Sequence, residues 1–235
     1  MAEPLLVVDD LHVTFQTHGN RAVHAVDGVS LTVNAGETVG IVGESGSGKS
    51  VTALAILGLL PSRGVTTSGS VRLNGQELLG APERVLQDVR GRRAAMVFQD
   101  PMTSLNPVLT IGRQLIETIT RHLDLDRHEA SSRAIELLDR VGIPEARRRL
   151  KSYPHQLSGG ERQRAAVARA LVTSPRLVLA DEPTGNLDGR NAEQVFALML
   201  ELNRELGTSL VVVTHDTRLA ARMDRVLELD NGALR

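Results

Sequence analysis

The sequence predicts an α/β fold, in which parallel strands alternate with helices and a helical segment is inserted in the middle of the chain. Runs of aliphatic and β-branched residues alternate with helical patterns toward both ends. From about residue 110 to 172, between them, the pattern turns helical. Aromatic residues make up only 2% of the 235 residues, so the core consists of Val, Leu, Ile and Ala. Such a core suits buried parallel strands better than an aromatic-rich β-sandwich.

In the first hundred residues, short apolar runs separated by turn-forming residues at 18–20 and 34–36 predict a series of strands. These strands are expected at 5–9, 11–15, 29–33, 38–42, 70–75 and 94–98. An apolar helix follows the strand at 38–42 after a glycine-rich loop. It is expected to continue to about Leu60, because Pro61 cannot continue a helix.

The strand and helix alternation returns after Pro175. The expected elements are a strand at 176–180, a helix at 190–206, a strand at 209–214 and a short helix at 217–223. The dipeptide Asn231-Gly232 predicts a tight hairpin near the C-terminus.

Composition and charge exclude several classes of function. The net charge is −1, so the chain has no overall positive field to hold nucleic acid. Cysteine is absent, which excludes disulfides, thiolate metal sites and thiol nucleophiles. Met1-Ala-Glu-Pro lacks the basic region of a secretory signal, and the longest apolar stretch, 51–60, is half of the ~20 residues that span a bilayer. We therefore expect a soluble, cytoplasmic protein whose membrane role comes through a partner.

Residues 43–50 match the phosphate-binding pattern G-x-x-x-x-G-K-[ST] and lie between a predicted strand and a predicted helix. Glycines in this loop let successive N–H groups point toward an anion, and the helix N-terminus adds its dipole. Lys49, one of only two lysines, places a compact ammonium between β- and γ-phosphates, where a planar guanidinium does not fit. The predicted nucleotide-binding residues are Gly43, Glu44, Ser45, Gly46, Ser47, Gly48, Lys49, Ser50 and Val51. The alternative is a glycine-rich turn without a ligand.

The predicted strand at 176–180 is followed by two acids, Asp181 and Glu182. Open α/β sheets bind ligands at the carboxyl ends of their strands, which is where both carboxylates are expected. Asp181 and the hydroxyl of Ser50 would hold Mg²⁺, and Glu182 would accept a proton from the water that attacks the γ-phosphorus. A solvated turn or a helix N-cap is the alternative for such an acidic pair.

A second glycine pair, Gly159-Gly160, follows Ser158 at the start of a strongly helical segment. Ser158 is a good N-cap, and the glycines leave backbone N–H groups open, so this helix end can also bind phosphate. One chain cannot easily use two such ends on one nucleotide, which suggests that the second serves the nucleotide of a partner. The alternative is simply a capped helix.

These motifs, in this order, resemble those of ATP-binding-cassette (ABC) ATPases over essentially all 235 residues. The resemblance implies that Phe15 stacks on adenine, that Gln99 senses Mg²⁺ and the γ-phosphate, and that His215 contacts the γ-phosphate. Asp188 would belong to the loop that crosses the dimer interface. Two copies would pair head-to-tail, each ATP lying between the Lys49 loop of one subunit and Ser158-Gly159-Gly160 of the other.

The resemblance also implies a P-loop NTPase fold, with a RecA-like parallel core, an antiparallel β subdomain and an inserted α-helical subdomain. The chain would be a single ABC ATPase domain over 1–235. Its core and β subdomain would span about 1–100 and 160–235, and its helical subdomain about 101–159.

The cargo is indicated by two different resemblances. Residues 1–156 resemble dipeptide and oligopeptide importer ATPases, on Leu59-Leu-Pro, Phe98-Gln-Asp-Pro-Met-Thr-Ser-Leu-Asn-Pro and Ser152-Tyr-Pro-His-Gln. From about residue 160 the chain resembles lipoprotein-release or macrolide-type exporter ATPases, on Gly160-Glu-Arg-Gln-Arg and Arg190-Asn-Ala-Glu. Family members touch the permease through the importer-like segment, which favours peptide transport, with lipoprotein or macrolide-type export as the alternative.

The partners implied are a second ATPase subunit, identical or not, transmembrane permeases and a substrate-binding protein. They would hold the chain on the cytoplasmic face of the inner membrane. A soluble ABC ATPase of DNA repair or translation control is a remote alternative, since the chain has neither a long coiled-coil insertion nor a second cassette. An intact Glu182 argues against a nucleotide sensor without hydrolysis.

Overall fold

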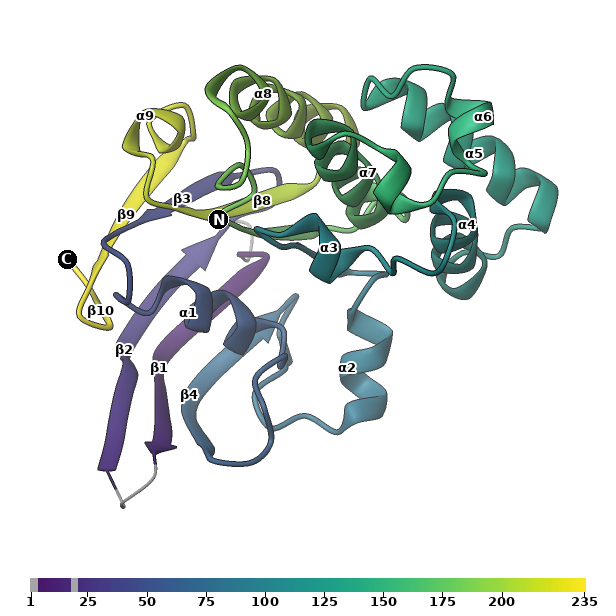
Figure 1. Ribbon diagram of the computed structural model, residues 1–235. Helices are drawn as coiled ribbons and strands as arrows, with labels where there is room; N and C mark the ends of the chain where they lie inside the picture. The colour runs from purple at the N-terminus through teal and green to yellow at the C-terminus, as the bar shows by residue number, and fades with distance from the viewer. Residues whose placement is uncertain (1–3, 18–20) are drawn as a thin grey trace. The chain divides into compact units, whose positions relative to one another are not determined.

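The computed structural model describes residues 4–17 and 21–235 (Figure 1). The turn predicted at 18–20 and the opening residues 1–3 lie outside this range. The chain forms two compact units, one of Met1–Arg90 and Ser209–Arg235 and the other of Gly91–Thr208. The division into subdomains at 101–159 stays a prediction.

The first unit contains an antiparallel sheet in the order β2-β1-β4-β5. Its strands are β1 (Leu6–Thr17), β2 (Arg21–Val33), β4 (Val65–Leu73) and β5 (Gln76–Glu77). The prediction of separate strands at 5–9 and 11–15 is wrong, because β1 runs through both. Its register shifts between Val8 and Leu11, where Asp10 takes a φ of 49°. Gly69 of β4 makes room for this bulge, since a Cβ there would lie 2.3 Å from the oxygen of Asp10.

Parallel strands form the second part of this unit. Strand β3 (Thr38–Val42) lies between β8 (Ser209–Thr214) and β9 (Arg225–Asp230) and is parallel to both, while β10 (Ala233–Leu234) is antiparallel to β9. Every residue of β3 and β8 is buried, as the aliphatic pattern predicts. The hairpin predicted at Asn231-Gly232 is confirmed, with φ angles of 48° and 85°.

The helices that the structure describes in the first unit are short, namely α1 (Lys49–Ile56), α2 (Glu83–Val89) and α9 (Thr217–Ala220). The predicted end of the first helix near Leu60 is wrong, because Gly58 takes a φ of 61° and closes the helix earlier. Likewise α9 is shorter than the predicted 217–223.

The second unit has two parallel strands, β6 (Ala94–Val97) and β7 (Leu177–Asp181), and most of the helices. These are α3 (Pro101–Ser104), α4 (Ile111–His122), α5 (Arg127–Arg140), α6 (Ala146–Arg149), α7 (Gly159–Leu171) and α8 (Gly189–Leu206). Helix α7 packs against β6, α3, α4, α5 and α8, which explains its small apolar residues at 165–168. Helices α4, α5 and α6 lie together (Figure 1). The helical character predicted for 110–172 is confirmed.

Several of these helices begin at a side-chain cap. Asp126 of α5 and Ser158 of α7 each form a capping box with the glutamate three residues later. Thr110 and Asp188 accept N–H groups from the first turns of α4 and α8. Within residues 4–17 and 21–235, no helix is both long and apolar enough to cross a bilayer.

Candidate functional site

The glycine-rich loop between β3 and α1 folds around the side chain of Lys49. The Lys49 Nζ donates hydrogen bonds of 2.8 Å to the carbonyls of Gly43 and Glu44, and the residue is only 6% exposed. Buried ammonium groups require partners, and here the loop's own carbonyls supply them. The loop therefore holds a positive charge inside a turn of backbone.

Two glycines of this loop are required by close backbone contacts. A Cβ at residue 43 would lie 2.1 Å from the oxygen of Leu229, and one at residue 48 would lie 2.2 Å from the oxygen of Ala25. Gly48, the N-cap of α1, also has a φ of 98°, which L side chains rarely adopt. Lack of space for a side chain therefore explains glycine at positions 43 and 48.

The buried hydroxyl of Ser47 bears on whether this loop can bind an anionic ligand. Its Oγ is buried, and it has no hydrogen-bond partner within the part of the chain that the structure describes. A buried hydroxyl without a partner lowers the stability of the fold, so a polar ligand that accepts a hydrogen bond from it would stabilise this loop. Together with the Lys49 ammonium and the N-terminus of α1, it provides donors suited to a polyphosphate.

The strand register brings His215 to the same edge of the parallel strands as the glycine-rich loop. Val42 of β3 pairs with Thr214 of β8, so Gly43 and His215 each leave the sheet one residue later. His215 is exposed. Phe15 lies on β1 opposite Val23 and is half-buried.

In the second unit, the acidic pair and Gln99 leave neighbouring strands at the same level. Val97 of β6 pairs with Ala180 of β7, so Gln99 and Glu182 each lie two residues beyond a paired position. Asp181 and Glu182 are half-buried and Gln99 is exposed. Glu182 has a φ of 45°, which is uncommon for a residue with a side chain.

The segment after Glu182 contacts the segment around Gln99. The Asn186 side-chain amide donates to the Gln99 carbonyl at 3.3 Å, and a Cβ at Gly185 would lie 2.9 Å from the Gln99 Nε2. The Gln163 amide of α7 donates to the neighbouring carbonyl of Phe98, also at 3.3 Å. Sequence reasoning did not predict either contact, because a side-chain amide aimed at a distant main-chain oxygen leaves no local pattern.

The N-terminus of α7 is capped as predicted from Ser158. The Ser158 Oγ accepts the N–H of Glu161 at 3.3 Å, and the Glu161 carboxylate accepts the N–H of Ser158 at 2.8 Å. A Cβ at Gly159 would meet open space, whereas a Cβ at Gly160 would lie 2.8 Å from the Oδ1 of Asn191. The first turns of α7 and α8 therefore meet at Gly160.

Asp188 caps α8 with both carboxylate oxygens. Its Oδ1 accepts the N–H of Asn191 at 3.0 Å and its Oδ2 accepts the Asn191 side-chain amide at 2.6 Å. These bonds, the backbone one first, lower the pKa of Asp188 below its ordinary value. The carboxylate is thus ionised at neutral pH, and its negative charge interacts favourably with the positive end of the α8 dipole.

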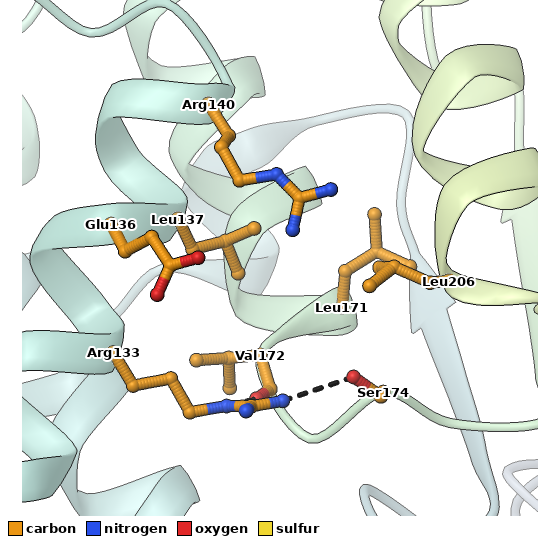
Figure 2. Close-up of a pocket in the computed structure, with 8 residues that line it drawn as sticks. All are labelled: Arg133, Glu136, Leu137, Arg140, Leu171, Val172, Ser174 and Leu206. Carbon is orange, nitrogen blue, oxygen red and sulfur yellow. Dashed lines mark hydrogen bonds between the residues drawn. The ribbon is translucent and has the colours of Figure 1, made fainter.

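A separate cavity of about 90 Å³ lies between α5 and the C-terminal ends of α7 and α8 (Figure 2). Leu137, Leu171 and Leu206 provide its apolar lining. Arg133 donates to the Ser174 hydroxyl at 2.9 Å, and Arg140 forms an ion pair with Glu205. Both cations are already engaged, so we assign no ligand to this cavity.

A strand, a glycine-rich loop that encloses a lysine, and a helix that starts at that lysine define a P-loop nucleotide-binding protein. A family model described as "ABC transporter" matches residues 26–185. The chain is 47% identical to the oligopeptide transport ATP-binding protein OppD of Salmonella typhimurium, over 98% of this chain and 69% of that one. It is 43% identical to the OppD protein of Bacillus subtilis, over 98% and 64%.

Among solved structures, the dimeric post-hydrolysis state of the ATP-binding cassette MJ0796, bound to ADP and Pi, superposes with a TM-score of 0.86 at 31% identity. The alignment covers 98% of this chain and 96% of that one. The chain belongs to the ABC transporter family and is an ATPase that converts ATP to ADP and phosphate. The predicted P-loop NTPase fold, with an antiparallel β subdomain and a helical region, is confirmed.

Proposed function

We propose that this chain is the ATP-hydrolysing subunit of a peptide importer. The observation that carries the proposal is the match to oligopeptide transport ATP-binding proteins along 98% of the chain. This match includes the residues after 160, for which sequence motifs favoured lipoprotein-release or macrolide-type export.

Residues 43–51 bind the phosphates of ATP. The Lys49 ammonium leaves the carbonyls of Gly43 and Glu44 for phosphate oxygens, and the buried Ser47 hydroxyl gains an acceptor. Phe15 stacks on the adenine ring. Stacking of Phe15 on the adenine ring and the contact of the Lys49 ammonium with phosphate oxygens would both stabilise the bound nucleotide.

The hydroxyl of Ser50, the Gln99 amide oxygen and the Asp181 carboxylate are the proposed ligands of Mg²⁺. Oxygen donors of this kind are those that Mg²⁺ prefers, together with substrate phosphates. The ion, when bound, neutralises charge that develops on the β- and γ-phosphates.

Glu182 accepts a proton from the attacking water, and His215 hydrogen-bonds the γ-phosphate. The left-handed backbone at Glu182 supports this role, because strain of this kind persists only where the surroundings demand one orientation. Gln99 reports the presence of the γ-phosphate to the segment that follows it.

Two ATPase subunits act together, each offering Ser158-Gly159-Gly160 to the nucleotide of its partner. The capped start of α7 presents backbone N–H groups and a helix dipole suited to a γ-phosphate. Asp188 lies in the segment that crosses between the subunits. Permease subunits and a peptide-binding protein complete the transporter, at the cytoplasmic face of the membrane. Nucleic acid is not a partner.

The test is reconstitution with candidate permeases in proteoliposomes. Co-purification with peptide-importer permeases and ATP-dependent peptide uptake are the expected results. Uptake should disappear in the Glu182→Gln variant, while its fold and nucleotide binding should stay intact. Association with lipoprotein-release or macrolide-type permeases instead, together with ATP-driven efflux, would replace import by export.

A further inference from the structure

An arginine from helix α6 reaches the N-terminus of α7. Arg149 is the last residue of α6, and its Nη2 lies 3.2 Å from the Oε1 of Glu161. The two side chains are 31% and 12% exposed, so water only partly screens this ion pair. Arg149 also donates a long hydrogen bond of 3.5 Å to the carbonyl of Gln156. Its guanidinium thus contacts one residue before Ser158, the N-cap of α7, and one residue after it.

Glu161 uses its two carboxylate oxygens for two different partners. The Oε2 accepts the N–H of Ser158, whereas the Oε1 faces Arg149. Burial alone would raise the pKa of Glu161. Hydrogen bonds with Ser158 and the charges of Arg149 and Arg164 outweigh burial, and the pKa is lowered overall. The capping carboxylate is therefore ionised, and its orientation is shared between Ser158 and Arg149.

We propose that Arg149 is a positioning residue for the nucleotide-contacting turn Ser158-Gly159-Gly160. By holding one oxygen of Glu161, it fixes the other on the Ser158 N–H, and so fixes where the turn presents its own donors. This inference rests on the proposed function, in which that turn contacts the nucleotide of the partner subunit. It adds a residue of α6, outside all the motifs that bind nucleotide.

A neighbouring arginine supplies a matched control. Arg148 lies in the same helix and pairs with Glu145 of its own turn at 2.9 Å, with 81% of its side chain exposed. Its ion pair joins residues of one helical turn and does not include Glu161. Replacing Arg148 removes the same charge without changing the cap of α7.

The experiment compares Arg149→Gln with Arg148→Gln in the full chain. We expect Arg149→Gln to lower kcat about fivefold and to weaken ATP-dependent dimerisation of the Glu182→Gln variant by a similar factor, the upper range for a partly exposed ion pair. Binding of ATP by the monomer, measured with a fluorescent analogue, stays unchanged, and the thermal midpoint falls by no more than about 4 °C. Arg148→Gln keeps wild-type values throughout.

A double-mutant cycle separates positioning from general loss of charge. Glu161→Gln keeps a capping oxygen but removes the negative charge, so Arg149→Gln should add no further loss in that background. Arg149→Lys should restore part of kcat. The inference would be overturned if Arg149→Gln lowered kcat by the same factor in the wild-type and Glu161→Gln backgrounds. It would also be overturned if kcat of Arg149→Gln lay within twofold of kcat of Arg148→Gln. Failure of the proposed function looks different, because the Glu182→Gln variant with Arg149 intact would then form no ATP-dependent dimer.

Discussion

The side-chain amide of Asn186 donates a hydrogen bond of 3.3 Å to the main-chain oxygen of Gln99. This bond joins the segment after β7, which begins with Glu182, to the segment after β6, which contains Gln99, the candidate sensor of Mg²⁺ and the γ-phosphate. The Gln163 amide holds the preceding carbonyl of Phe98. Two consecutive carbonyls around Gln99 are therefore held by two different elements of the same unit.

Removing this bond should slow hydrolysis without unfolding the protein. We expect Asn186→Ala to lower kcat by up to about tenfold, the equivalent of one neutral hydrogen bond, and to change the affinity for ATP little. Steady-state hydrolysis and nucleotide binding measure the two quantities. The exposed Gln87 on α2 supplies the control, Gln87→Ala, which should behave as wild type. An unchanged kcat in Asn186→Ala would mean that the contact has no role in turnover.

The Glu182→Gln variant should bind ATP but hydrolyse it roughly 10²–10⁴-fold more slowly, the range for losing a general base. ATP-bound dimers should accumulate, which size-exclusion chromatography with ATP detects. The exposed Glu201 of α8 loses the same charge in Glu201→Gln and should have no such effect. Normal turnover in Glu182→Gln would remove this residue from the mechanism.

Replacing Lys49 by Ala should weaken ATP binding by about 10- to 100-fold, as expected when one charge-assisted contact is lost. Calorimetric titration with a non-hydrolysable ATP analogue measures this change. The other lysine of the chain, at position 151, is exposed, and Lys151→Ala serves as the control. Full affinity in the Lys49→Ala variant would contradict the phosphate-binding role of the loop.

Two glycines should differ sharply in their tolerance of alanine. Gly48→Ala places a Cβ 2.2 Å from a carbonyl at a φ of 98°, and should cost about 2 kcal/mol or more of stability. Gly189→Ala, in the first turn of α8 with open space around it, should be neutral or slightly stabilising. Urea unfolding of both variants measures the difference. Similar midpoints for the two would argue against the close contact at Gly48.

Stability should fall in acid because capping carboxylates are ionised in the folded state. The N–H groups of Glu129 and His128 lower the pKa of Asp126, so its contribution is complete above the unfolded pKa of about 4 and is lost as pH falls through the lower folded value. Asp126→Asn keeps a capping oxygen without a charge, and its stability should depend less steeply on pH between about 4 and 2. Chemical unfolding at several pH values makes the comparison. Identical slopes in wild type and Asp126→Asn would exclude Asp126 as a source of this dependence.

Much of the fold follows from local patterns in the sequence. The strand, loop and helix at 38–56 are specified by β-branched residues, glycines and a helix start within a few positions of one another. The hairpin at Asn231-Gly232 and the cap at Ser158 are equally local, and the structure confirms both.

The remainder depends on residues far apart in the sequence. The bulge at Asp10 exists because Gly69 admits the Asp10 carbonyl, and no pattern near residue 10 records that. The contacts Asn186–Gln99 and Arg149–Glu161 likewise join different elements. Because open α/β sheets bind ligands at the carboxyl ends of their parallel strands, the residues that follow those strands could be predicted as site residues. The residues that hold them in place could not, because their contacts form only in the folded chain.

The contact between Gly160 and Asn191 constrains how this sequence can change through evolution. A side chain at 160 would meet the Asn191 amide, and a change at 191 would remove the side-chain hydrogen bond that Asp188 accepts. A mutation at Gly160, Asn191 or Asp188 is therefore tolerated best when a second mutation at one of the other two positions compensates for it.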